Sequence, residues 1–413
     1  MSAPLTVLCA GAYGIRNAGD DLPLIALMEG LRSALSGREL RFRALSRHPD
    51  AEDAVLLGAT LVPNLEHESG AAARGRWFNG MNPDDDPAIF ANVQAEIAGC
   101  DLLVLGAGNA LLDQTIGLLH GPVPLMALYG SLARLHDRPV MLYGMSVGPL
   151  RTEWGRDLSR QLIGDAAVVT VRDAESFALC RELLRRPREI HLLPDATLAV
   201  APPEPGRGRQ VLRLENMDVP DDRPVIALGL RDLVRPLGEQ AGLRQEAAVL
   251  GLLERWADRA TFLFVPQSTY REDDDRVLAD RLAAQAPAGC RCLVVHKRHH
   301  PLDLVSLYGL AAVTIASRLH GAVFSAIAGT PPVGLDYLPK MRGFLDHLPG
   351  CHERLALETL TADGLNAAVT HLIDEGEQRR LRLAARVTDL RRQAARYATL
   401  AAGELSRSRP RGA

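Results

Sequence analysis

The sequence predicts an α/β protein with two Rossmann-like lobes and a C-terminal helical segment. Short apolar runs alternate with helical patterns along most of the 413 residues, which is typical of a parallel sheet covered on both faces. The alternation stops at residues 201–224 and then resumes, which indicates a second lobe. After about residue 351 the pattern is helical only, so we expect the chain to end in helices.

The first lobe is predicted to span residues 1–200. Amphipathic segments at Leu22–Leu35 and Asp86–Ile97 are two of its expected helices. Its predicted strands are Leu5–Cys9, Leu40–Leu45, Asp101–Leu105, Val140–Tyr143, Ala167–Val171 and Ile190–Leu193. The next stretch, 201–224, is rich in Pro, Arg and Asp and is predicted to be a linker or an inserted hairpin.

The second lobe is predicted to span residues 225–350, with helices over 351–405 and a disordered tail over 406–413. Its predicted strands are Val225–Leu230, Thr261–Val265, Leu293–His296, Val313–Ala316 and Pro332–Leu335. One face of the C-terminal helical pattern is predicted to be buried, and it carries Leu383, Val387, Leu390, Ala394 and Tyr397. The opposite face holds arginines from Arg379 to Arg396; we expect it to face solvent, with peripheral contact to an anionic membrane as the alternative.

Composition excludes several classes of protein. The 47 basic and 50 acidic residues give a net charge of −3, which argues against a nucleic-acid-binding scaffold. The N-terminus resembles a first strand rather than a signal peptide, and no apolar run is long enough to span a membrane. The six cysteines lack zinc spacing. We therefore expect a reduced, cytoplasmic protein with no bound metal.

Glycine-rich turns follow three predicted strands of the first lobe. The first contains Gly14, Asn17 and Asp20; the second contains Gly106, Gly108, Asn109 and Asp113; the third begins at Gly144. Because ligands of α/β folds bind at the carboxyl ends of strands, these turns predict the rim of a cleft. The alternative for the first turn is a strand–helix connection capped by Asn17 or Asp20.

The second lobe carries the most specific signal. The segment Ser317-Arg318-Leu319-His320 follows an apolar strand and opens a helix, and Arg231 ends the first strand of the same lobe. Arginine binds phosphate or carboxylate through two parallel hydrogen bonds, and histidine can transfer a proton near neutral pH. Arg318 and His320 are therefore predicted to face one site, the alternative being that His320 is a buried helix-capping residue.

Other charged positions have two interpretations each. Lys340 is one of only two lysines, which suggests a role that needs a compact ammonium group. Arg172 could bind an anion or pair with the neighbouring Asp173. The acidic run Arg271–Asp275 is interpreted as the start of a helix rather than a metal site. The cluster of His296, His299 and His300 is interpreted as a surface loop.

Taken together, five motifs resemble those of the polysaccharide pyruvyl transferase family. They are G-x-Y-G-x-x-N-x-G-D from Gly11, D-L-L-V-L-G-A-G-N-x-L-L-D from Asp101, V-R-D-x-x-S from Val171, S-R-L-H-G from Ser317 and Y-x-x-K ending at Lys340. They occur in the family's order over residues 11–340. The chain departs at Ala107, where the family usually has a third glycine, and at Ser146-Val147, before the Gly-Pro step. Both departures lie in the first lobe, which in this family would face the acceptor, so they concern the identity of the acceptor rather than the reaction.

The resemblance implies a GT-B-like fold with an interlobe active site, where phosphoenolpyruvate is the donor and a pyruvate ketal forms on two hydroxyls of a sugar or lipid-linked glycan. The donor side would comprise Arg231, Ser317, Leu319, Lys340 and Arg172, with Arg318 and His320 catalytic and His320 the general acid. The acceptor side would comprise Gly14, Asn17, Asp20, Gly106, Gly108, Asn109 and Asp113, with Asp20 or Asp113 as the base.

The scheme requires neither a metal nor an organic cofactor. A cytoplasmic enzyme, with contact to the inner face of the membrane, would fit a lipid-linked acceptor. The alternatives are a nucleotide-sugar glycosyltransferase of the same fold, a family member with a non-polysaccharide acceptor, and a protein that binds an anionic metabolite without turnover.

Overall fold

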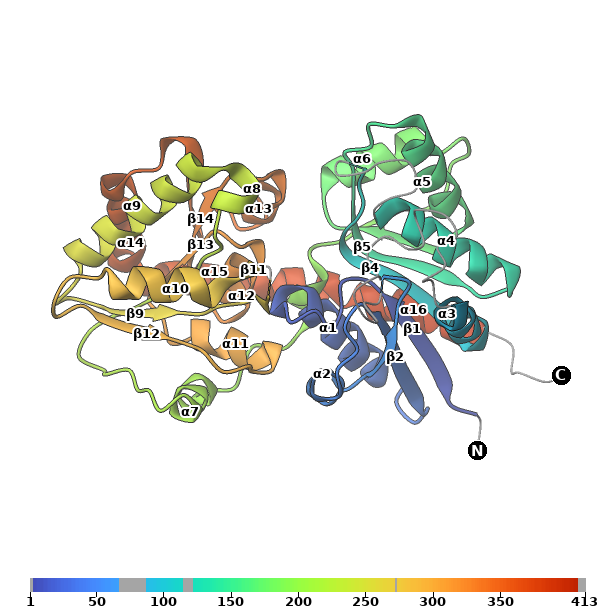
Figure 1. Cartoon of the computed structure of the whole chain (residues 1–413), viewed down its shortest axis with the longest axis horizontal. Helices are drawn as coiled ribbons and strands as arrows, with labels where there is room; N and C mark the ends of the chain where they lie inside the picture. The colour runs from blue at the N-terminus through green and yellow to red at the C-terminus, as the bar shows by residue number, and fades with distance from the viewer. Residues whose placement is uncertain (1–2, 67–86, 114–121, 272, 408–413) are drawn as a thin grey trace. The chain divides into compact units, whose positions relative to one another are not determined.

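A computed structural model describes residues 3–66, 87–113, 122–271 and 273–407 (Figure 1). The described chain divides into two compact units. The first unit comprises the residues up to Arg16, Asp20–Ala199 and the residues from Arg392 onward. The second unit comprises Asn17–Gly19 and Val200–Arg391. The three residues Asn17–Gly19 therefore belong to the second unit although both of their flanks belong to the first.

The first unit is built on a seven-stranded parallel sheet with the order β3-β2-β1-β4-β5-β6-β7. Strand β6 is buried throughout and β5 everywhere except Ser146, because helices cover both faces of the sheet. The strands are β1 (Leu5–Ala10), β2 (Leu40–Ser46), β3 (Thr60–Pro63), β4 (Leu102–Leu111), β5 (Val140–Val147), β6 (Val168–Val171) and β7 (His191–Leu192).

The helices of the first unit begin where side chains cap their free N–H groups. Asp50 caps α2, Thr152 caps α5 and Asp173 caps α6. The helices are α1 (Ala18–Ala34), α2 (Ala51–Leu57), α3 (Pro87–Gly99), α4 (Pro122–Leu135), α5 (Glu153–Asp165) and α6 (Ala174–Leu183), followed by the 3-10 turn η1 (Ala196–Ala199).

The second unit repeats the same topology. Its six-stranded parallel sheet has the order β12-β9-β8-β13-β14-β15, in which chain order reverses between β8 and β13. Ligands of such sheets bind at the carboxyl ends of the two strands where the order reverses. The strands are β8 (Val225–Gly229), β9 (Thr261–Phe264), β12 (Arg291–Val294), β13 (Val313–Ala316), β14 (Pro332–Asp336) and β15 (Glu353–Ala356), and a separate hairpin joins β10 (Thr269–Tyr270) to β11 (Asp273–Asp274).

The helices of the second unit cover this sheet and enclose an aliphatic core with few aromatic residues. They are α7 (Arg207–Leu214), α8 (Val234–Leu237), α9 (Glu239–Arg255), α10 (Asp275–Ala284), α11 (Pro301–Tyr308), α12 (Leu319–Ile327), α13 (Pro339–Leu345), the 3-10 turn η2 (Leu357–Thr359), α14 (Ala362–Asp374) and α15 (Gly376–Ala394).

The last described helix, α16 (Arg396–Arg407), belongs to the first unit and packs on β4, β5 and β6 (Figure 1). All five residues of the predicted apolar face of the C-terminal helices are buried. The arginine face is only partly exposed, because Arg379 is buried and pairs with Glu353 and Glu375. Within the described ranges, no helix is long and apolar enough to cross a membrane.

The predicted fold class is confirmed, and the differences lie at the boundaries. The segment 201–224 contains α7, an Arg-rich helix that buries Val211 and Leu212, and not a hairpin. The second sheet extends beyond residue 350, because β15 pairs with β14. Helix α16 runs two residues into the predicted tail, whose last six residues lie outside the described part of the chain.

Candidate active site

The two strands at the order reversal of the second sheet end side by side, and each delivers one arginine. Arg231 follows β8, and Arg318 follows β13. The backbone N–H groups of Ser317 and Arg318 donate to the Gly229 carbonyl at 3.1 and 3.3 Å. The Ser317 hydroxyl accepts a hydrogen bond from the Arg231 N–H at 2.9 Å. The two predicted anion-binding arginines are thus brought to one place by the sheet itself.

Arg318 is held by Asp275, the first residue of α10. Its Nε and Nη2 donate to the two carboxylate oxygens of Asp275, each at 2.6 Å. Asp275 Oδ2 also accepts the N–H groups of Gln267 and Ser268, both at 3.0 Å. The Asp275 side chain is only 2 % exposed. This pair is therefore a buried, fixed part of the second unit.

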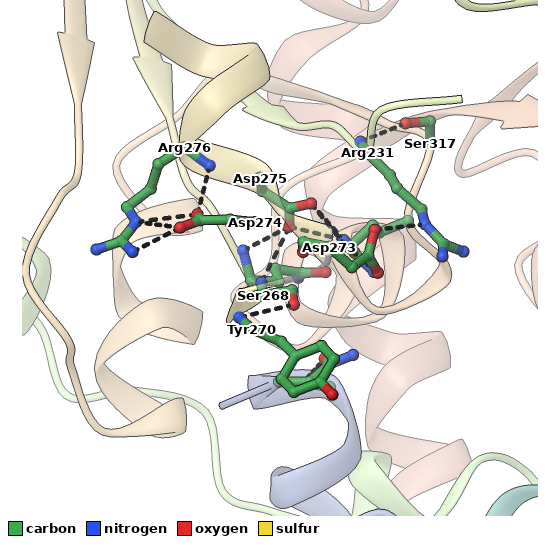
Figure 2. Close-up of polar contacts among 12 residues, drawn as sticks. Arg231, Ser268, Tyr270, Asp273, Asp274, Asp275, Arg276 and Ser317 are labelled. Carbon is green, nitrogen blue, oxygen red and sulfur yellow. Dashed lines mark hydrogen bonds and ion pairs between the residues drawn. The ribbon is translucent and has the colours of Figure 1, made fainter. Parts of the chain in front are cut away.

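Asp273 lies between the two arginines. Its Oδ1 accepts from Arg231 Nε at 3.1 Å, and its Oδ2 accepts from Arg318 Nη2 at 2.9 Å. Figure 2 shows Asp273 turned toward Arg231, whereas Asp274 is turned away toward Arg276. Because side chains alternate along an extended strand, Asp273 and Asp275 serve the arginines while Asp274 caps α10.

These contacts fix the charge of Arg318. Burial opposes the guanidinium charge, but Asp275 and then Asp273 outweigh it and raise the pKa of Arg318 further. Burial raises the pKa of the Tyr337 hydroxyl. The charge of Arg231 and its hydrogen bond to Tyr337 act in the opposite direction and lower that pKa. Tyr337 therefore belongs to the same group of side chains as Arg231 and Arg318.

His320 lies in the first turn of α12, two residues after Arg318, and is half-buried. The backbone of Gly19 packs directly on its ring. A Cβ atom built on Gly19 would lie 2.6 Å from Cγ and 2.8 Å from Cβ of His320. The Ala18 N–H donates to the Gln267 carbonyl at 2.8 Å, and Asn17 forms a bridge with Ser268. The segment Asn17–Gly19 thus contacts both His320 and the loop that holds Asp275.

The remaining donor-side residues occupy different positions. Leu319 is buried as the first residue of α12. Lys340 is half-buried in the first turn of α13, close in sequence to Asp336, whose Oδ2 accepts from Arg342 Nε at 2.9 Å. Arg172 lies in the first unit, where its Nη1 donates to Asp195 at 2.8 Å and its Nε to Ser146 at 2.8 Å. Asp195 is thus an acidic partner of Arg172, while Asp173 caps α6 and accepts a hydrogen bond from the Ser146 hydroxyl.

On the acceptor side, only the turn with Gly14 follows its strand, β1. The predicted turns at Gly106, Gly108 and Gly144 are wrong, because β4 runs on to Leu111 and β5 to Val147, and these glycines lie inside the two strands. Gly14, Gly106 and Gly108 have φ values of 66°, 122° and 104°, which favour glycine. Gly14 donates its N–H to Asp21 at 2.8 Å, and the Gly106 carbonyl accepts from the Tyr13 hydroxyl. Asp20 lies half-buried in the first turn of α1. Asn17, however, belongs to the second unit, and the side chain of Asn109 lies outside the described part of the chain.

Asp113 has the geometry of a structural anchor. Its carboxylate accepts hydrogen bonds from the Arg151 N–H at 2.6 Å and from the Thr152 N–H and hydroxyl at 2.7 and 2.6 Å. Burial acts to raise the pKa of Asp113, but the Thr152 and Arg151 hydrogen bonds outweigh it and lower that pKa. A carboxylate committed in this way is poorly disposed to accept a proton.

Sequence reasoning missed the acidic partners of the arginines and the contact between Gly19 and His320. The available signal was the acidic run itself, since two strand-end arginines in one sheet need counter-ions. The histidine cluster is dispersed among separate partners: His296 bonds Asp280, His299 is buried against Glu215, and His300 caps α11. Among the described residues, no group of three or more His, Cys, Asp or Glu could hold a metal ion.

Comparison with known proteins adds a family and a fold. Residues 17–339 match the family model described as polysaccharide pyruvyl transferase. The amylovoran biosynthesis protein AmsJ of Erwinia amylovora is 22 % identical over 410 residues, which cover 91 % of this chain and 93 % of that protein.

Two solved structures show the same fold. UDP-GlcNAc 2-epimerase of Neisseria meningitidis, bound to UDP-GlcNAc, superposes with a TM-score of 0.60 at 10 % identity, covering 98 % of this chain and 100 % of that one. The Anabaena protein HepE in complex with UDP-glucose gives a TM-score of 0.58 at 12 % identity, with the same coverage. The described fold is therefore GT-B-like.

Proposed function

Because the chain belongs to the polysaccharide pyruvyl transferase family, we propose that it transfers the enolpyruvyl group of phosphoenolpyruvate to a sugar or glycan. The product is a pyruvate ketal on two acceptor hydroxyls, and inorganic phosphate is released. One observation carries the proposal: Arg231 and Arg318 bind opposite oxygens of one carboxylate, beside the turn of α12 that bears His320. Such a pair is suited to an anion with separate oxygen acceptors.

The donor requires this positive charge. Phosphoenolpyruvate carries a carboxylate and a phosphate, with about three negative charges at pH 7. Arg231 and Arg318 are assigned to bind it, with Lys340 contributing from the first turn of α13 and Ser317 holding the Arg231 backbone. Arg172 is a weaker candidate, since Asp195 and Ser146 already occupy its guanidinium group.

His320 is assigned as the general acid. It donates a proton to the methylene carbon of the donor, which becomes a methyl group and leaves C2 electrophilic. One acceptor hydroxyl adds to C2 and loses its proton, and the bond from C2 to the phosphate oxygen breaks. The second hydroxyl then adds to C2, loses its proton and closes the ketal. In this scheme Asp20 accepts a hydroxyl proton, and Gly14, Gly106 and Gly108 belong to the acceptor side.

The acceptor is proposed by class only. AmsJ is named for the biosynthesis of amylovoran, so a sugar or lipid-linked glycan destined for an extracellular polysaccharide is the acceptor class to try first. A lipid-linked acceptor would bring this enzyme to the inner face of the membrane from the cytoplasm. No cofactor is required by the scheme.

The test measures phosphate release from phosphoenolpyruvate by the full chain against a panel of free sugars, nucleotide sugars and lipid-linked oligosaccharides. We expect acceptor-dependent phosphate release and a product heavier by pyruvate less one water. His320→Gln serves as the inactive control. Transfer of sugar from a nucleotide sugar, without any need for phosphoenolpyruvate, would instead identify a glycosyltransferase and overturn the proposal.

A further inference from the structure

We propose that Asp273 is a displaceable counter-ion, whose carboxylate occupies the position between Arg231 and Arg318 that an anionic group of the substrate takes. Asp275 is the fixed counter-ion that keeps Arg318 in place. The inference rests on the proposed function only for the identity of the anion, because an anion site between two arginines would serve other phosphate or carboxylate ligands too.

The binding geometry of Asp273 is that of a ligand. Each carboxylate oxygen accepts from a different guanidinium group, at 3.1 Å from Arg231 Nε and 2.9 Å from Arg318 Nη2. A substrate carboxylate or phosphate with two oxygens could accept the same two donors. In Asp275, in contrast, both carboxylate oxygens accept side-chain donors from Arg318 alone.

The two aspartates differ in how firmly they are held. Asp275 is 2 % exposed and also accepts two backbone N–H groups, so its removal would leave buried donors without acceptors. The Asp273 side chain is 25 % exposed, and Arg231 is 28 % exposed. Asp273 also sits on β11, a two-residue strand paired only with β10. Asp273 and Arg231 are therefore open to an anion from solvent, whereas Asp275 is not.

The charge balance favours the exchange. The two arginines and two aspartates cancel, so a donor with about three negative charges would meet no net attraction from this group while all four are paired. Displacing the Asp273 carboxylate leaves two cations and one anion around the substrate. These four side chains thus contribute a net positive charge to the site only when the donor replaces Asp273.

The chain provides a matched control in the intervening residue. Asp274 has the same side chain and nearly the same sequence position, but its carboxylate pairs with Arg276 at 2.6 Å and caps α10. Asp274→Asn removes one negative charge near the site without touching either arginine. Any difference between Asp273→Asn and Asp274→Asn therefore reports the contacts, not the net charge.

The experiment is calorimetric titration of the full chain and of Asp273→Asn, Asp274→Asn and Asp275→Asn, with inorganic phosphate and, separately, with phosphoenolpyruvate. We expect Asp273→Asn to lower the dissociation constant roughly three- to tenfold, the range for a partly exposed charge. Asp274→Asn should bind as the unsubstituted protein does. Asp275→Asn should bind more weakly, because Arg318 loses its buried partner. Asp273→Ala is titrated alongside as a second removal of the carboxylate.

The outcomes separate this inference from the proposed function. If Asp273→Asn and Asp273→Ala bind phosphate more tightly while no variant turns over phosphoenolpyruvate, the counter-ion exchange stands and the function fails. If the enzyme turns over phosphoenolpyruvate but both variants bind the two anions no better or more weakly, Asp273 only positions the arginines and the inference is overturned. Failure of every variant to bind either anion also overturns it.

Discussion

At the scale of single residues, Arg231 and Arg318 are chemically alike but structurally unequal. Arg318 has a side chain 10 % exposed and two acidic partners, whereas Arg231 is 28 % exposed and shares one of them. Arg231 can therefore be changed without leaving a buried carboxylate unpaired, and Arg318 cannot. This difference decides which substitution reports on binding and which reports on folding.

Arg231→Gln is expected to raise the donor KM strongly with little loss of stability, because a charge-assisted contact is lost at a partly exposed position. Arg318→Gln should instead cost about 3–5 kcal/mol of folding free energy, since Asp275 is left buried without its partner. Urea unfolding and steady-state kinetics of both variants measure the contrast. Equal losses of stability in the two would contradict it.

Gly19→Ala is expected to lower kcat by roughly 10²-fold, because the added methyl group displaces His320 and small misplacements of a reacting group are costly. Donor affinity should change little, since the arginines are not touched. Gly164→Ala is the matched control: it is also a helical glycine, and a Cβ there meets no atom within 4 Å. Normal turnover by Gly19→Ala would show that His320 is not the acid or does not need this position.

At the scale of secondary-structure elements, apolar strands were predictable even at four residues, whereas β3, β15 and the polar hairpin β10–β11 were not. Every predicted strand corresponds to a strand of one of the two sheets. The missed strands β3 and β15 are four residues long and half polar or proline-terminated, so their pairing is decided by the neighbouring strand rather than by their own pattern. Arg231 and Arg318 were predictable as strand-end residues because the apolar strands that precede them, β8 and β13, were predictable.

The hairpin β10–β11 and its aspartates were not predictable, because an acidic run before a helix is satisfied by capping alone. Of the three consecutive aspartates, two in β11 and one that begins α10, Asp274 does cap α10. The other two are directed to Arg231 and Arg318, which lie 42 and 43 residues away in sequence. Partners so distant are fixed only by the sheet that brings the strand ends together.

Asp113→Asn is expected to destabilise the protein by about 1–3 kcal/mol, since the turn at Arg151–Thr152 loses a carboxylate that accepts its N–H groups. Because the folded pKa of Asp113 lies below the ordinary value of 3.8, this contribution is complete above that value and is lost as pH falls through the folded pKa. Thermal unfolding at pH 7 and in acid measures the difference. The exposed Asp157→Asn is the control, and an effect of equal size there would contradict the assignment.

At the scale of the whole molecule, the chain completes its first unit only at its end. Helix α16 supplies Tyr397, whose hydroxyl donates to the Pro194 carbonyl at 3.0 Å and whose ring meets Tyr143 edge-on at 5.0 Å. Ala398 lies against Gly30. Residues separated by most of the sequence thus pack in one core. The sequence analysis assigned consecutive residue ranges to each lobe, so it did not predict that the C-terminal helix belongs to the first unit.

Tyr397→Ala is therefore expected to cost about 3–5 kcal/mol, as for other buried aromatic side chains. Hydrogen exchange should report the loss in β4, β5 and β6, the strands that α16 covers. Leu381→Ala, at a position 65 % exposed on α15, is the control and should change stability little. Destabilisation confined to the second unit would contradict this account.

The most direct test of the central claim is the mass of an acceptor glycan after incubation with the full chain and phosphoenolpyruvate. The account predicts that the acceptor gains pyruvate less one water, that one phosphate appears per ketal, and that Arg231→Gln requires far more donor for the same yield. An acceptor that gains a sugar from a nucleotide sugar, with phosphoenolpyruvate left intact across the panel, would contradict it.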